Sequence, residues 1–190
     1  YAREALKNGL KLEKKLGVNP FKFGMAAGTD AHTSLPAVAE NNFFGMHSGV
    51  APDPHRYEHI VIESPLDPSL TTYGWQQAAS GYTAVWATEN TREAIFDAMK
   101  RKDTYATTGS RINVRFFGGW EFTEEDAQSR MPGALGYEKG VSMGGDLNGT
   151  PDGKEAPNFL VAAMKDPLSG NLDRIQIIKG WLDAEGKTHE

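Results

Sequence analysis

Two side chains that bind metals in many proteins stand two positions apart early in the chain. They are Asp30 and His32, in the stretch GMAAGTDAHTS over residues 24–34. Residues i and i+2 of an extended chain point to the same side, so the carboxylate oxygen and the imidazole nitrogen can reach a common point. Such a pair is part of a ligand set for Zn²⁺, Mn²⁺ or Fe. The same spacing has a plainer interpretation, in which Asp30 caps the following turn and His32 is its hydrogen-bond partner.

The remaining ligands of a metal site are not obvious in this sequence. The chain has no cysteine, so any metal must be held by histidine and carboxylate. A catalytic zinc takes three protein ligands, and Asp30 and His32 supply only two.

Two further residues are candidates for binding a substrate. His47 lies in a glycine-rich stretch close in sequence to Asp30, where it either lines a pocket or is simply a loop residue. Arg111 ends the polar run 107–111, whose hydroxyls, backbone N–H groups and guanidinium suit a phosphate group. The alternative is a turn between two domains, with Arg111 on the surface.

The composition argues against two classes of partner. Lys and Arg total 20 against 25 Asp and Glu, a formal net charge of −5. A nucleic-acid-binding surface needs clustered Lys and Arg, so no nucleic acid is expected as a partner. No apolar run approaches the ~20 residues of a membrane-spanning helix, so no membrane span is expected. With 190 residues, of which 39% are hydrophobic, the chain has the size and balance of one large or two small globular domains.

Residues 1–109 alternate between predicted helices and strands, which is typical of a parallel α/β unit. Apolar residues recur near helical spacing over residues 1–16, and Gly17 is expected to end that helix. A capping box of Asn90 and Glu93 is expected to begin a second helix, which runs to about Lys102. The other predicted elements are strands within 21–30, 81–87 and 104–109, a short helix over 34–44, and a long loop insertion over 45–81 with a short strand or helix at 59–63.

From residue 110 the pattern changes to β structure. Alternating or continuous apolar residues predict strands within 111–122, 158–166 and 173–183, and residues 123–157 are predicted to be mostly loop. A helical pattern is not visible in this half. A turn around Gly186 is expected to lead into the first residues of a return strand. We therefore place a domain boundary near Gly109, between an α/β part (1–109) and a β-rich, sandwich-like and truncated module (110–190).

The stretch GTDAH resembles the last metal-binding motif of the PHP superfamily, the polymerase and histidinol phosphatase-like phosphoesterases. Residues 1–25, 28–35, 85–120 and 156–190 resemble the C-terminal part of a bacterial branch of that superfamily, the domain of unknown function 3604 family. The resemblance implies a distorted (β/α)7 barrel, with residues 1–109 as its C-terminal part. It also implies that Asp30 and His32 are metal ligands with a catalytic role.

The same resemblance implies a metal-dependent hydrolase of the phosphoesterase kind, in which a metal-activated water attacks a small anionic ester. Zn, Mn or Fe is the implied cofactor of the intact protein. The H-x-H motif of the early barrel strands is absent from this chain, so we expect a fragment that is inactive by itself and can lack the metal. A cut barrel has open strand edges that invite pairing, which favours a homodimer through the truncated seam. A periplasmic or secreted location is favoured over a cytoplasmic one.

A function of another class stays open on the sequence alone. In this alternative the chain is a non-catalytic binding module, its β-rich half binds a carbohydrate or another protein, and the D-x-H pair is vestigial. An upstream H-x-H followed by further His and Glu residues would discriminate in favour of the enzyme.

Overall fold

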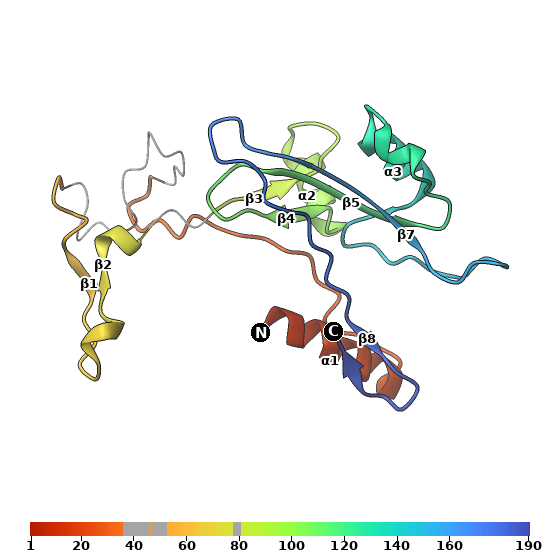
Figure 1. Ribbon diagram of the computed structural model, residues 1–190, viewed down its shortest axis with the longest axis horizontal. Helices are drawn as coiled ribbons and strands as arrows, with labels where there is room; N and C mark the ends of the chain where they lie inside the picture. The colour runs from red at the N-terminus through yellow and green to blue at the C-terminus, as the bar shows by residue number, and fades with distance from the viewer. Residues whose placement is uncertain (36–45, 47–52, 78–80) are drawn as a thin grey trace.

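The computed structural model describes residues 1–35, 46, 53–77 and 81–190 (Figure 1). The chain begins with helix α1 (Ala2–Leu16), which confirms the predicted N-terminal helix. Gly17 ends it in the left-handed conformation, with φ of 75°, and its N–H donates to the Glu13 carbonyl at 2.9 Å. This is the usual role of glycine at a helix C-terminus, where a side chain would be strained.

The prediction of a strand within 21–30 is wrong, because residues 22–31 have no regular secondary structure. The helix predicted over 34–44 falls almost entirely outside the described residues. Within the predicted loop 45–81, the described part contains an antiparallel hairpin of β1 (Ile60–Ile62) and β2 (Thr72–Tyr73), which confirms the short element expected at 59–63. Two 3-10 turns, Pro68–Leu70 and Gly74–Gln76, flank β2, and the hairpin stands well away from the other strands (Figure 1).

A second antiparallel pair of strands, which we call the β3–β4 hairpin, is connected through a helix. Strand β3 (Thr83–Val85) pairs antiparallel with β4 (Thr104–Ala106), and helix α2 (Arg92–Lys100) lies between them in sequence. All three elements were predicted, but the expected capping box was not found. Thr91 is the N-terminal cap instead, and its hydroxyl accepts from the Ala94 N–H at 3.3 Å. Asn90 therefore lies one position before the cap.

The largest sheet has the order β6–β5–β7 and is antiparallel throughout. Strand β5 (Asn113–Gly119) and strand β7 (Asn158–Met164) pair over seven residue positions, which confirms two of the predicted strands. The short β6 (Val141–Ser142) lies on the other edge of β5. In the described part of the chain every strand pair is antiparallel, so the parallel pairing expected for residues 1–109 is not seen there.

Residues 123–157 contain a helix that the sequence did not indicate. A 3-10 turn (Glu125–Gln128) precedes α3 (Pro132–Lys139), which has Pro132 in its first turn. Gly133 and Gly136 weaken helix propensity and carry no side chain that could show a periodic apolar face. Gly136 is nevertheless required by packing, because a Cβ there would lie 2.3 Å from Cδ2 of Phe117.

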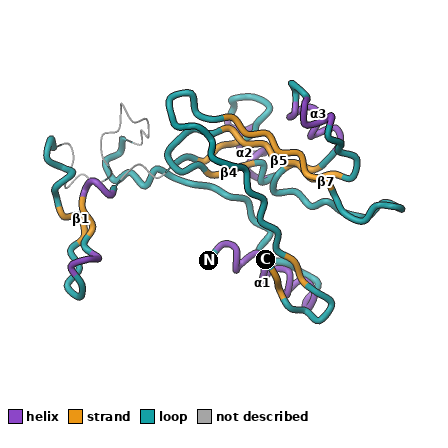
Figure 2. Tube along the Cα trace, viewed as in Figure 1, coloured by secondary structure: helices purple, strands orange, loops and turns teal. Residues whose placement is uncertain are grey.

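The two ends of the chain meet. The C-terminal hairpin of β8 (Trp181–Leu182) and β9 (Thr188–His189) turns at Gly186, as predicted, and includes the expected return strand. The long strand predicted over 173–183 is reduced to β8, and Figure 2 shows the connection from β7 to β8 as loop. The hairpin packs on α1, where Lys14 Nζ donates to the Ala184 carbonyl at 2.6 Å and Arg3 pairs with Glu190 at 2.7 Å.

The described residues thus form a small mixed helix and strand domain with small sheets. None of the helices in these ranges is both long enough and apolar enough to cross a bilayer. The main buried apolar cluster consists of Phe117 on β5, Leu160 on β7 and Phe122, which follows β5 in sequence. Leu135 of α3 packs against it.

This small cluster makes Leu160 a sensitive position. We expect Leu160→Ala to lower the free energy of unfolding by about 2–5 kcal/mol, because the substitution leaves a cavity between β7 and α3. Leu160 is 4% exposed, whereas Leu168 is 92% exposed, so Leu168→Ala is a matched control with an expected change below about 0.5 kcal/mol. Urea unfolding followed by circular dichroism measures both. Equal effects of the two substitutions would contradict this location of the core.

Asp126 ties the 3-10 turn to α3. Its carboxylate accepts from Lys139 Nζ at 2.7 Å and from the Thr123 N–H at 2.8 Å. The Lys139 hydrogen bond and then the Thr123 N–H lower the pKa of Asp126 below its ordinary value. At a pH above the ordinary pKa of an aspartate, the ionised carboxylate therefore stabilises the fold. This contribution is lost as the pH falls through the lowered pKa of Asp126.

We therefore expect Asp126→Asn to be destabilising at about pH 7 and to approach the wild type in stability as the pH falls through the lowered pKa of Asp126. Urea unfolding at a series of pH values measures the difference. Asp152→Asn, at an exposed aspartate, is the control and should follow the wild type at every pH. A difference for Asp126→Asn that persists unchanged to the lowest pH would contradict the role of the ionised carboxylate.

Candidate functional site

The structure brings Asp30 and His32 into direct contact. His32 Nε2 lies 3.1 Å from Asp30 Oδ1, and the two side chains are 55% and 67% exposed. The backbone is turned rather than extended here, because Asp30 has φ of 53°. The contact is the hydrogen bond of the plainer interpretation. It also suits a metal, because ligand bonds of about 2.1 Å at a tetrahedral angle place two donor atoms roughly 3.4 Å apart.

Threonine hydroxyls position the segment that leads to this pair. Thr83 Oγ1 accepts from the Ala27 N–H at 2.9 Å and donates to the Ala27 carbonyl at 2.6 Å. Thr104 Oγ1 donates to the Met25 carbonyl at 3.0 Å. Two side chains of the β3–β4 hairpin thus bond the backbone groups that a neighbouring strand would otherwise bond. The segment is fixed beside the hairpin without joining its sheet.

Further hydrogen bonds fix the backbone around the pair. The Ala31 N–H donates to Thr29 Oγ1 at 3.3 Å, and the His32 N–H donates to the Met46 carbonyl at 2.7 Å. Met46 is itself buried. The turn that carries the imidazole is therefore attached to a part of the chain fourteen positions further on.

Within the described ranges no group of three His, Cys, Asp or Glu side chains converges, at the pair or elsewhere. His47 lies outside the described residues. Asp53 and His55 repeat the D-x-H spacing, but there Asp53 Oδ1 accepts from the backbone N–H of His55 at 2.7 Å. The spacing alone therefore does not produce a contact between carboxylate and imidazole.

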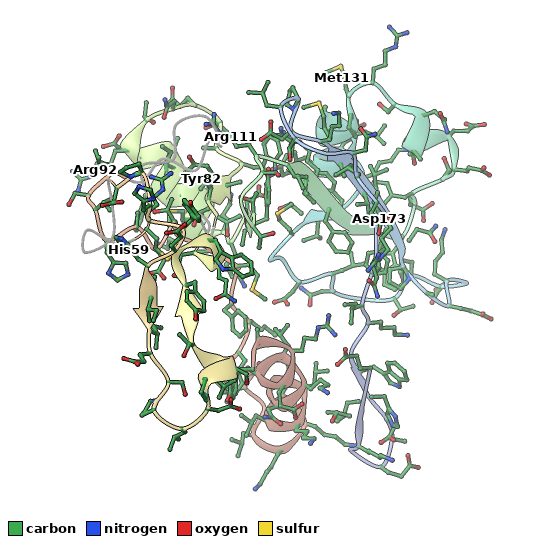
Figure 3. The ribbon with its side chains drawn as sticks, turned by 60° about the vertical axis from the view of Figure 1, so that its left-hand side comes forward. His59, Tyr82, Arg92, Arg111, Met131 and Asp173 are labelled. Carbon is green, nitrogen blue, oxygen red and sulfur yellow. The ribbon has the colours of Figure 1, made fainter. Side chains whose placement is uncertain are left out.

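Arg111 lies at a pocket that the sequence did not reveal. An open hollow of about 600 Å³ between the β3–β4 hairpin and the start of β5 has two tyrosines, two apolar residues and three polar residues in its lining: Tyr82, Ala84, Tyr105, Thr107, Arg111, Ile112 and Asn113. We call it the Tyr82 pocket. Figure 3 shows Tyr82 and Arg111 next to each other, and the guanidinium carbon lies 5.7 Å from the centroid of the Tyr82 ring.

The segment that leads to the pair and the Tyr82 pocket lie on opposite faces of the hairpin. Ala84 is paired with Tyr105, and these two side chains share one face. Thr83 and Thr104 are on the other face, where they hold Ala27 and Met25. Because Met25 lies at Thr104 and Ala27 at Thr83, the segment runs toward the end of the hairpin formed by Tyr82 and Thr107. Side chains alternate between the two faces along each strand. Only the pairing register reveals that Ala84 of β3 and Tyr105 of β4 share a face.

A second polar cluster surrounds the buried side chain of Asp103. The Tyr137 hydroxyl of α3 donates to Asp103 Oδ2 at 2.5 Å, and the Arg115 guanidinium carbon lies 3.5 Å from the Trp86 ring centroid. Burial, and then the Asp103 hydrogen bond, raise the pKa of Tyr137. This cluster joins α3 and β5 to the β3–β4 hairpin, and its side chains are not in the lining of the pocket.

The chain belongs to the family described as protein of unknown function (DUF3604), whose sequence profile matches residues 1–190. It is 30% identical over 97 residues to an uncharacterized protein of Chlamydia trachomatis serovar D. The match covers 51% of this chain and 14% of the length of that protein. No solved structure matches the chain.

The arrangement of the pair depends on Thr83, which gives a direct test. We expect Thr83→Val, which keeps the shape of the side chain, to lower the free energy of unfolding by about 1–3 kcal/mol because two backbone groups of Ala27 lose their partner. Thr108→Val, at an exposed threonine, is the control. Urea unfolding measures both. If Thr83→Val is no more destabilising than the control, the hydroxyl does not hold the segment.

Proposed function

We propose that this chain carries part of the metal site of a metal-dependent hydrolase, phosphoesterase-like, with Asp30 and His32 as two ligands. The observation that carries the proposal is the 3.1 Å contact between Asp30 Oδ1 and His32 Nε2 on the exposed end of a fixed segment. A carboxylate oxygen with an imidazole nitrogen is a donor set for Zn, Mn or Fe. Further ligands are required, and in this proposal they come from residues beyond the described ranges or from the remainder of the intact protein.

The residues of the chain have separate roles in this proposal. A bound divalent metal supplies a water of lowered pKa and polarises the bond under attack. Asp30 would hold the ion and would also orient the attacking water. His32 ligates through one ring nitrogen, while Thr83 keeps the segment in position. The substrate is a small anionic ester. Arg111 lines the Tyr82 pocket and has no role at the metal in this proposal.

The remaining parts of the proposal concern assembly. The chain by itself is expected to be inactive, because two ligands do not complete a catalytic metal site. A homodimer, formed through strand edges that are left open, and a periplasmic or secreted location belong to the same proposal.

A non-catalytic binding module is the second candidate function. The Tyr82 pocket favours it, because the pocket combines apolar walls with polar groups and needs no metal to hold a ligand. In this function the hydrogen bond between Asp30 and His32 serves only to fix a surface turn. The two functions differ in one measurable property, which is whether the pair binds a metal ion.

The test is metal content, measured by mass spectrometry on the intact protein purified without chelator and supplied with Mn²⁺ or Zn²⁺. We expect at least one equivalent in the wild type and at least a tenfold loss of affinity in Asp30→Ala and in His32→Ala, because each substitution removes a ligand. The double variant Asp53→Ala and His55→Ala has the same spacing and is the control. It should bind metal as the wild type does.

Two results would contradict the hydrolase proposal. One is a wild type that binds neither metal. The other is binding that the Asp30 and His32 substitutions leave unchanged. Either result would favour the binding module.

A further inference from the structure

We infer that the Tyr82 pocket is a binding site for a small organic anion in which a phosphate, sulfate or carboxylate group is attached to a flat ring. This site is separate from the metal pair and does not need it. The inference rests on the composition of the pocket, on the charges around it and on its place on the hairpin.

The volume and lining of the pocket suit a small molecule. About 600 Å³ is within the range of small-molecule sites, which are mostly apolar with a few polar groups. Two tyrosine rings with Ala84 and Ile112 provide the apolar contact area. The hydroxyl of Tyr105 donates to the Ile112 carbonyl at 2.9 Å, so one of these rings is already held in place. A rigid aromatic surface favours stacking with a flat ring over contact with a flexible chain.

Three of the residues that line the pocket are polar. Thr107, Arg111 and Asn113 follow one another along the chain from the end of β4 to the start of β5. Thr107 Oγ1 accepts from the Tyr82 N–H at 3.1 Å, which fixes this hydroxyl beside the Tyr82 backbone. Arg111 is exposed, and across the described ranges it is not among the ion-paired residues. An ionised donor beside a hydroxyl and an amide is the arrangement that binds an oxyanion.

Asp166 fixes the backbone position of Arg111 at the pocket. One of its oxygens accepts from the Arg111 N–H at 2.8 Å and the other from the Leu168 N–H at 3.0 Å. These two backbone N–H groups lower the pKa of Asp166, with smaller contributions from the charges of Arg111 and Lys165. The carboxylate therefore bonds the backbone on both oxygens and anchors residue 111, while the guanidinium extends over the Tyr82 ring.

The test is calorimetric titration of the full chain in EDTA, which removes any contribution of a metal. The probes are phenylphosphonate, which has a ring and an anionic group, methylphosphonate, which lacks the ring, and benzyl alcohol, which lacks the charge. Benzoate is a fourth probe that shows whether a carboxylate replaces the phosphonate. We expect phenylphosphonate to bind at least tenfold more tightly than methylphosphonate and benzyl alcohol.

Substitutions then locate the binding. Arg111→Gln keeps the backbone N–H that bonds Asp166 and removes only the charge, so we expect about a tenfold or greater rise in the dissociation constant. Tyr82→Leu should have a similar effect because it removes the ring. Arg130→Gln, at another exposed arginine, is the control and should leave binding unchanged. Circular dichroism confirms that each variant is folded.

Three results would overturn the inference. They are no binding of phenylphosphonate, equal binding of a probe that lacks the ring or the charge, and equal loss in Arg111→Gln and Arg130→Gln. None of these depends on Asp30 or His32, so the pocket and the metal pair can fail independently.

Discussion

The pairing of β5 on both of its edges is the constraint on which most of this structure depends. Its seven-position register with β7 determines which side chains of the two strands share a face. Phe117 on β5 is paired directly with Leu160, and both are buried. Helix α3 can approach this face only through Gly136, where any side chain would overlap the Phe117 ring. A shift of one position would turn Phe117 away from the core and remove the reason for a glycine there.

The candidate site depends indirectly on the sheet that contains β5. Trp86, which follows β3, donates its ring N–H to the Val114 carbonyl on β5 at 2.8 Å. That bond holds the β3–β4 hairpin against the sheet, and the hairpin then holds the segment of Asp30 through Thr83 and Thr104. Each step uses a side chain that bonds a backbone group. Such bonds are directional, and each costs about 1–3 kcal/mol when the buried partner is left unsatisfied, so they position the pair precisely enough for contact.

Local pattern was sufficient for the elements that carry a periodic apolar face. Helices α1 and α2 and strands β5 and β7 all show one, and each was predicted. Helix α3 was missed because Gly133 and Gly136 leave its face without a pattern. The antiparallel pairing was also missed, because the partner of a strand is chosen by contacts distant in sequence. The Tyr82 pocket was missed for the same reason. Its residues come from three separate stretches, and the register of β3 and β4 brings the first two together.

The two D-x-H stretches show why spacing indicated the Asp30 and His32 contact but could not guarantee it. In the stretch that contains Asp53, the nearest donor to the carboxylate is the backbone N–H of His55, and the side chain closes on its own backbone. In the other stretch that donor is already used, because the His32 N–H bonds the Met46 carbonyl. Asp30 then bonds the imidazole instead. The backbone partner of His32, fourteen positions away, thus decides whether this carboxylate bonds a backbone N–H or the imidazole.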